Sequence, residues 1–180
     1  MKTWSDKIPL KKRTILYEAL VVSVLMYNSS CWAAPKSVLE KLDIVHRRHL
    51  RAILNYSHRY PNIISNQNLY KRCNAKPLSV RVNQSRWRML GHVLRGPTDG
   101  PAYSSLLFAV NTLQYPGRRG RPQSNLFSLI LSDLKRHDLS LSTAEDLHEL
   151  SSIASNKVYW RSLQFWMLFS RERLDDSVVF

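Results

Sequence analysis

The sequence predicts an all-α fold, an irregular bundle of about six helices joined by basic loops. Apolar residues recur with helical spacing over long stretches, and no stretch shows the alternation that is typical of a strand. Only five glycines and eight prolines interrupt the 180 residues, which leaves long runs free of helix breakers. Hydrophobic residues make up 44% of the chain, enough to form a core, and this argues against wholesale disorder.

The first half of the chain contains the longest predicted helices. The first is expected over about 9–27, where Pro9 suits a first helical position. The second is expected over about 37–54, because Ser37 and Glu40 have the spacing of a capping box. Two further helices are predicted over about 66–72 and 77–95, and Gly96-Pro97 ends the second of them.

Shorter helical stretches and loops rich in Gly and Pro follow. Ser142 and Glu145 form a second predicted capping box. The basic loop 114–123 is the predicted linker between a basic helical domain over 1–113 and a small helical C-terminal region over 124–180. The helices expected in this half span about 124–137 and 156–174, and a short helical turn is expected over 103–110.

Charge is distributed unevenly. The chain has 27 Lys and Arg against 13 Asp and Glu, a formal net charge of +14. The segment from Lys36 to Arg95 contains 13 basic residues and only two acids. The positive electrostatic field of such a segment favours a polyanionic partner, either nucleic acid or an acidic membrane surface. The most apolar window, 15–27, has 13 residues and contains Glu18, so it is too short to span a bilayer. We therefore expect a nucleic-acid partner and no membrane.

The cysteine content indicates a reducing compartment. Cys31 and Cys73 are the two cysteines of the chain, too few for a disulfide framework. The opening residues, "MKTWSDKIPLKKRT", lack the apolar run of a secretory signal. An intracellular location, nuclear or cytoplasmic, is the expectation.

The stretch "RWRMLGHVLRG" (86–96) lies in a predicted amphipathic helix. At about 100° per residue, one set of polar and basic residues falls in a strip about 80° wide, opposite the apolar face: Arg81, Ser85, Arg88, His92 and Arg95. The arginines of this ridge repel each other, and a phosphate backbone would remove that repulsion. The predicted nucleic-acid contacts of this helix are Arg81, Arg88, His92 and Arg95.

Two residues of this stretch allow more than one interpretation. His92 has no second ligand at metal-binding spacing, so hydrogen bonding is expected rather than metal binding. Gly91, in mid-helix, costs about 1 kcal/mol relative to alanine. One interpretation is that another helix or a sugar–phosphate approaches the backbone closely at Gly91. The other is that the glycine is merely tolerated there.

A second helix and one loop extend the basic surface. The predicted helix 37–54 has an apolar face, and His46 and His49 at its edge are expected to be core histidines rather than metal ligands. The loop 116–122 is either a minor-groove clamp or a basic linker. The predicted contacts from these two segments are Arg47, Arg48 and Arg51 on the helix and Arg118, Arg119 and Arg121 in the loop.

Motifs for catalysis are missing from the sequence. We find no Gly-rich phosphate loop, no HExxH, no cysteine cluster and no legible Ser–His–Asp arrangement. The adjacent acids Asp175 and Asp176 trail the last predicted helix and are expected to be solvated. The expectation is therefore a protein with no catalytic residue, no cofactor and no metal site.

Six short motifs, in this order, resemble the region downstream of the palm in the endonuclease–reverse transcriptase polyproteins of retrotransposons without long terminal repeats. Asn28, in the first of them, stands where that family usually has glycine, and asparagine tolerates a left-handed turn best after glycine. The likeness covers about 10–163. The motifs are "LMYNSSCW" (25–32), "RRHLRAIL" (47–54), "NQNLYKRCNAKPLSVRV" (66–82), "RWRMLGHVLR" (86–95), "RGRP" (119–122) and "NKVYWR" (156–161).

This resemblance implies a thumb-like domain over 1–113 that grips a template–primer duplex of RNA, DNA or a hybrid. The family's palm, with its metal-binding aspartates, and its endonuclease are absent from the chain, so neither activity carries over. The missing palm is a further expected partner. The leading hypothesis is a non-catalytic nucleic-acid-binding fragment. The alternatives are a helical protein–protein interaction module and an inert remnant of a decayed element.

Overall fold

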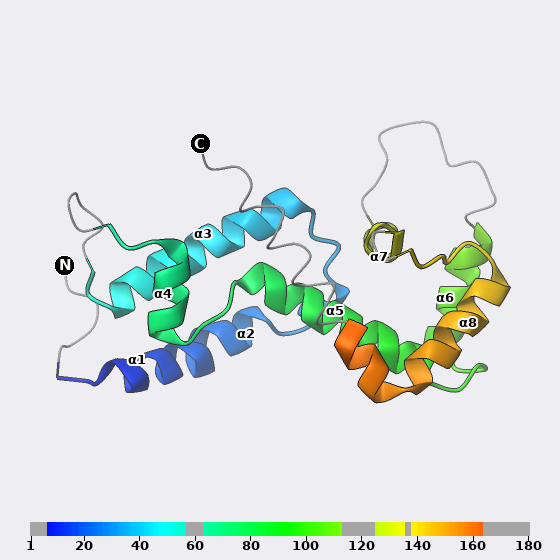
Figure 1. The fold of residues 1–180 in the computed structure, drawn as a ribbon, viewed down its shortest axis with the longest axis horizontal. Coiled ribbons are helices and arrows are strands. Elements are labelled where there is room, and N and C mark those ends of the chain that lie inside the picture. Colours follow the sequence, from blue (N-terminus) through cyan, green and yellow to red (C-terminus); the bar gives the residue numbers. More distant parts are fainter. Residues whose placement is uncertain (1–6, 57–62, 113–124, 136–137, 164–180) are drawn as a thin grey trace. The chain divides into compact units, whose positions relative to one another are not determined.

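A computed structural model describes residues 7–56, 63–112, 125–135 and 138–163 (Figure 1). The predicted all-α fold is confirmed, since every long regular element in these ranges is a helix, although there are more helices than the six expected. They are α1 (Leu10–Tyr17), a π-helical segment (Glu18–Val22), α2 (Ser23–Leu25), α3 (Lys36–Ile53), α4 (Asn66–Cys73), α5 (Leu78–Leu94), α6 (Pro101–Thr112), α7 (Leu126–Lys135) and α8 (Ala144–Ser155).

Two compact units make up the chain. Unit 1 comprises Met1–Ser29 and Ala34–Val82, and unit 2 comprises Ser30–Ala33 and Asn83–Phe180. The division therefore falls within α5. The linker predicted over 114–123 lies outside the described residues and stays a prediction.

The first predicted helix is present as a continuous run from α1 through the π-helical segment to α2. The π-helical segment adds a wider turn that apolar periodicity does not reveal. Asn28 follows with φ of 53°, the left-handed conformation that asparagine tolerates best after glycine. The turn expected from the motif "LMYNSSCW" is therefore confirmed.

Both predicted capping boxes are wrong in detail. The N-cap of α3 is Pro35, which has no side-chain cap, so Ser37 lies inside the first turn. At α8 the box is shifted by one residue: the Thr143 hydroxyl accepts from the Asp146 N–H at 3.1 Å, and the Asp146 carboxylate accepts from the Thr143 N–H at 3.2 Å. Either register satisfies the S/T-x-x-acid spacing, which is why the sequence did not separate them.

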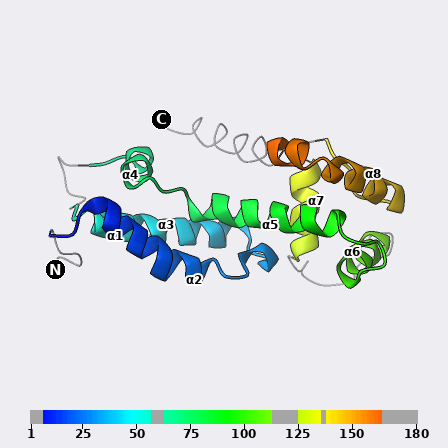
Figure 2. The ribbon, with the colours of Figure 1, turned by 90° about the horizontal axis from the view of Figure 1, so that it is seen from below.

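The core of unit 1 forms where α3 packs against α1 and α4 (Figures 1 and 2). Leu50 and Ile53 of α3 and Leu69 of α4 are fully buried there. Arg13 of α1 reaches the end of α3, where its Nη1 donates to the Ile53 carbonyl at 2.6 Å. This bond satisfies one of the carbonyls that a helix leaves free at its C-terminus.

A buried tyrosine–histidine pair joins α1 to α3. The Tyr17 hydroxyl is hydrogen-bonded to His46 Nδ1 at 2.8 Å, with the donor set by the histidine tautomer, and the two rings stack with centroids 5.6 Å apart. Burial raises the pKa of Tyr17 to about 12 and lowers the pKa of His46 below its usual value. Both rings are therefore neutral near pH 7. The expectation that His46 is a core histidine is confirmed, whereas His49 is exposed.

Unit 2 is built around the second half of α5, with α7 crossing it at a steep angle (Figures 1 and 2). Trp87 and Leu94 of α5 are buried in the same core as Leu134 of α7 and Leu150 of α8. The chain is helical again over 157–163. The predicted far end of that helix lies outside the described residues.

Gly91 makes room for a tryptophan. The indole of Trp160, which is 2% exposed, donates from Nε1 to the Trp87 carbonyl at 3.2 Å. A Cβ atom at Gly91 would lie 2.2 Å from that same Nε1. Of the interpretations open for Gly91, the structure supports a close approach from within the protein, made by a side chain.

We expect the substitution Gly91→Ala to destabilise unit 2 by about 1–3 kcal/mol, because the indole must move to avoid the new methyl group. At an open mid-helix position the same change would stabilise by about 1 kcal/mol. Urea unfolding followed by circular dichroism measures the sign. In a Trp160→Leu background the penalty should disappear, and a penalty of equal size in both backgrounds would contradict the contact.

The low pKa of His46 predicts acid sensitivity. The unfolded chain takes up a proton below about pH 6.5 that the folded chain excludes, so stability falls as the pH drops from 6.5 toward the folded pKa. Desolvation dominates, Arg81 acts in the same direction, and Glu18 and Asp43 oppose it. The contribution is at most about 1.4 kcal/mol per pH unit.

This contribution is measured by urea unfolding at several pH values. His46→Gln should remove the part of the pH dependence that the buried ring supplies. His92→Gln, at an exposed histidine, is the matched control and should leave the dependence unchanged. Parallel pH profiles for the wild type and His46→Gln would show that another group is responsible.

Candidate nucleic-acid interface

The structure splits the predicted ridge of α5. Arg81, in unit 1, donates from Nη1 to the Glu18 carboxylate at 2.7 Å and is half-buried. In unit 2, Arg95 donates from Nη1 to the Ala154 carbonyl at 3.0 Å. Arg88 and His92 are exposed. Two of the three ridge arginines therefore bind acceptors within the protein, and the exposed part of the ridge is Arg88 with His92.

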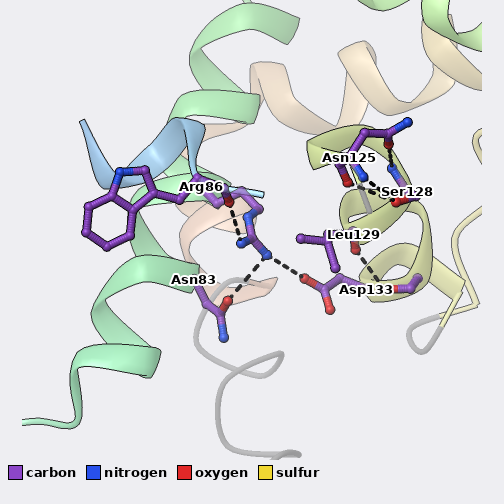
Figure 3. Close-up of polar contacts among 8 residues, drawn as sticks. Asn83, Arg86, Asn125, Ser128, Leu129 and Asp133 are labelled. Carbon is purple, nitrogen blue, oxygen red and sulfur yellow. Dashed lines mark hydrogen bonds and ion pairs between the residues drawn. The ribbon is translucent and has the colours of Figure 1, made fainter. Parts of the chain in front are cut away.

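Another arginine of α5 is structural. Arg86 is 3% exposed and lies 3.7 Å from the Asp133 carboxylate of α7 (Figure 3). It also donates to the Trp32 carbonyl at 3.1 Å and lies 3.5 Å from the Asn83 side chain. A buried cation needs this many partners because burial removes its hydration. Figure 3 shows the guanidinium pointing toward the side chains of Asn83 and Asp133.

The arginines of α3, in contrast, lie together around one groove. The groove has a volume of about 430 Å³ and runs between α3 and the segment that enters α4. Arg48 is exposed, and Arg47 and Arg51 are half-buried. All three residues predicted on this helix are thus brought together, within little more than one turn. The groove is lined by Ile44, Arg47, Arg48, Arg51, Ile63, Ile64, Ser65 and Asn66; we call it the arginine groove.

The start of α4 forms the opposite wall of the arginine groove. Ser65 caps the helix by accepting from the Asn68 N–H at 3.2 Å. Asn66 accepts from Arg51 Nη2 at 2.9 Å, which fixes that guanidinium against the wall. The first N–H groups of a helix carry partial positive charge and favour anions. Guanidinium groups and a helix N-terminus therefore line one groove.

Among the residues that the structure describes, no carboxylate lines the arginine groove. In the described part of unit 1, 13 Lys and Arg stand against three acids, a net charge of +10. Each acid has a partner elsewhere: Glu18 binds Arg81, Glu40 lies 3.8 Å from Lys36, and Asp43 accepts from the Ser79 N–H and hydroxyl at 3.0 and 2.6 Å. The described part of unit 2 holds six bases and six acids. Among the described residues, the excess of positive charge therefore lies in unit 1.

A second hollow adjoins the arginine groove. Its volume is about 630 Å³, and Ile63 and Ile64 line both spaces. The other lining residues are Tyr56, Asn68, Lys71 and Arg72; we call this space the tyrosine hollow.

The sequence had not singled out several of these residues. Lys71 and Arg72 lie in the basic segment, but no periodic pattern distinguishes them from other surface cations. Ser65 is a polar residue directly before a predicted helix, so it could have been identified as a cap. Nothing local to 63–66 reveals that this segment faces α3.

Some predictions fall on residues that the structure does not describe. Arg118, Arg119 and Arg121 of the predicted clamp are among them, as are Asp175 and Asp176. Within the described ranges, no group of three or more His, Cys, Asp and Glu side chains has the geometry to hold a metal ion. None of the described helices is both long and apolar enough to cross a membrane.

No family model, curated protein or solved structure matches this chain.

Proposed function

We propose that this chain is a non-catalytic nucleic-acid-binding module that grips a sugar–phosphate backbone, with the arginine groove as its central contact. The observation that carries the proposal is that Arg47, Arg48 and Arg51 line one groove, and that none of the described residues lining it is an acid. An anion bound there would reduce the repulsion among three like charges.

The chemistry of the groove suits phosphate. Arginine has a planar fork of donors that matches phosphate oxygens, and Arg51 is already oriented by Asn66. The N-terminus of α4 adds backbone donors. Contacts to phosphates fix the position of the protein on the nucleic-acid backbone and carry little information about the base sequence. The proposed binding is therefore strong at low salt and weakly sequence-specific.

The resemblance to retrotransposon reverse transcriptases supports the same role. The three groove arginines belong to the motif "RRHLRAIL" (47–54). A segment downstream of the palm that holds the template–primer would need this kind of basic surface. The ligand class is RNA, DNA or a hybrid duplex, and the polymerase chemistry belongs to the palm.

A second candidate function is docking of a protein partner, and one observation favours it. An apolar row along the helical run from α1 to α2 and the turn that follows it is exposed: Leu16 at 41%, Leu20 at 67%, Val24 at 72% and Tyr27 at 83%. Their spacing places them along one side of the helical run. Exposed apolar rows mark interaction sites more often than free surface. The palm domain that the resemblance implies is the expected occupant.

Titration with nucleic acid tests the leading proposal. With about six phosphate contacts, log K should fall with log salt at a slope of about −5. Arg47→Gln/Arg48→Gln should weaken binding and make the slope about 2 units shallower, because two contacts are lost. Fluorescence anisotropy with a labelled DNA duplex and an RNA–DNA hybrid provides both measurements.

A matched control separates the arginine groove from net charge. Lys11→Gln/Lys12→Gln removes the same charge from exposed positions of α1 that line neither space. It should change the slope far less than the arginine variant does. Equal effects of the two variants, or an affinity that ignores salt, would contradict the proposed grip.

The apolar row predicts self-association in the absence of its partner. Leu20→Ser/Val24→Ser should shift the protein toward monomer at concentrations where the wild type associates, because two exposed apolar side chains are removed. Sedimentation velocity measures this. If the wild type and the variant sediment identically as monomers, the row is not adhesive and the second candidate loses its support.

A further inference from the structure

We infer that the tyrosine hollow receives unpaired bases, so that the module prefers single-stranded nucleic acid to a duplex. This inference rests on the proposed function, because it requires a strand already held in the arginine groove. It specifies single-stranded nucleic acid as the preferred ligand, which the arginine groove alone does not define.

The end of α3 determines where Tyr56 lies. Asn55 takes a left-handed conformation with φ of 52°, which ends the helix. The Tyr56 N–H then donates to the Arg51 carbonyl at 3.0 Å. This bond fixes the tyrosine at the corner between α3 and the segment that leads to α4. The ring therefore lines the tyrosine hollow from a position tied to one of the groove arginines.

The surfaces of the tyrosine hollow combine apolar and cationic groups. Ile63, on the wall shared with the arginine groove, is 61% exposed. Lys71 and Arg72, in the last turn of α4, are exposed on the other side. A volume of about 630 Å³ lies within the range of about 300–1,000 Å³ that is typical of small-ligand sites. Proteins that bind single strands combine such cations with an aromatic platform.

Cations on both sides of an apolar wall suit a strand that crosses it. Its phosphates would contact the α3 arginines on one side and Lys71 with Arg72 on the other. The bases between them would lie over Ile63 and against Tyr56. Bases in a duplex are already stacked and paired, so they cannot enter the hollow without an unstacking cost. The tyrosine hollow therefore favours a single strand over a duplex.

The experiment compares one strand of about 12 nucleotides, free and annealed to its complement, by anisotropy at one salt concentration. The wild type should bind the free strand about tenfold more tightly. Tyr56→Leu keeps an apolar side chain but removes the aromatic face. It should weaken single-strand binding about tenfold and duplex binding by less than about twofold.

Because Tyr56 also packs against the unit 1 core, a surface variant provides a second test. Lys71→Gln/Arg72→Gln should make the single-strand salt slope shallower by about 1.4, whereas Lys11→Gln/Lys12→Gln should not. Salt-dependent duplex binding without a single-strand preference would overturn this inference and leave the proposed function intact. The absence of binding to either probe would overturn both. Equal losses on the two probes in Tyr56→Leu would overturn the role of the hollow.

Discussion

The function proposed for unit 1 depends on where its few carboxylates are bound. The three acids of its described part are engaged by Arg81, Lys36 and Ser79, away from the arginine groove. An acid that turned toward the arginine groove could neutralise one of its arginines and remove the reason to bind an anion. The ion pair between Glu18 and Arg81 joins the π-helical segment to α5 and engages one of these acids.

Arginine has two different roles in this chain, and burial separates them. Arg86 is surrounded by acceptors, and removing one of them would leave a buried charge uncompensated at high cost. Arg48 is exposed and lines a groove. The two residues have the same chemistry and lie in similarly basic motifs. Only the three-dimensional environment shows that one stabilises the fold and the other is available to a ligand.

Helix positions were predictable from the sequence because apolar periodicity and helix breakers act locally, and α3, α4 and α5 begin and end within about two residues of their expected bounds. The left-handed turn at Asn28 was also a local property. The sequence did not predict that two arginines of the α5 ridge bind acceptors within the protein, because Glu18 and Ala154 lie about 60 residues from the arginines that they bind. A helical wheel shows which side chains share a face, but not which distant groups have already engaged them.

Two of the motifs that carry the resemblance stated from the sequence meet in space in this chain. Gly91 of "RWRMLGHVLR" leaves the space that the indole of Trp160, in "NKVYWR", fills, and the same indole binds the Trp87 carbonyl. A larger residue at Gly91 would exclude the tryptophan, and a smaller one at Trp160 would leave a void. The best-marked motif of the chain therefore has a packing role in unit 2, whereas "RRHLRAIL" supplies the arginine groove of unit 1. Under the proposed function, the chain combines a packing motif in unit 2 with a phosphate-facing motif in unit 1, because a helical module of this kind must both fold and hold a polyanion.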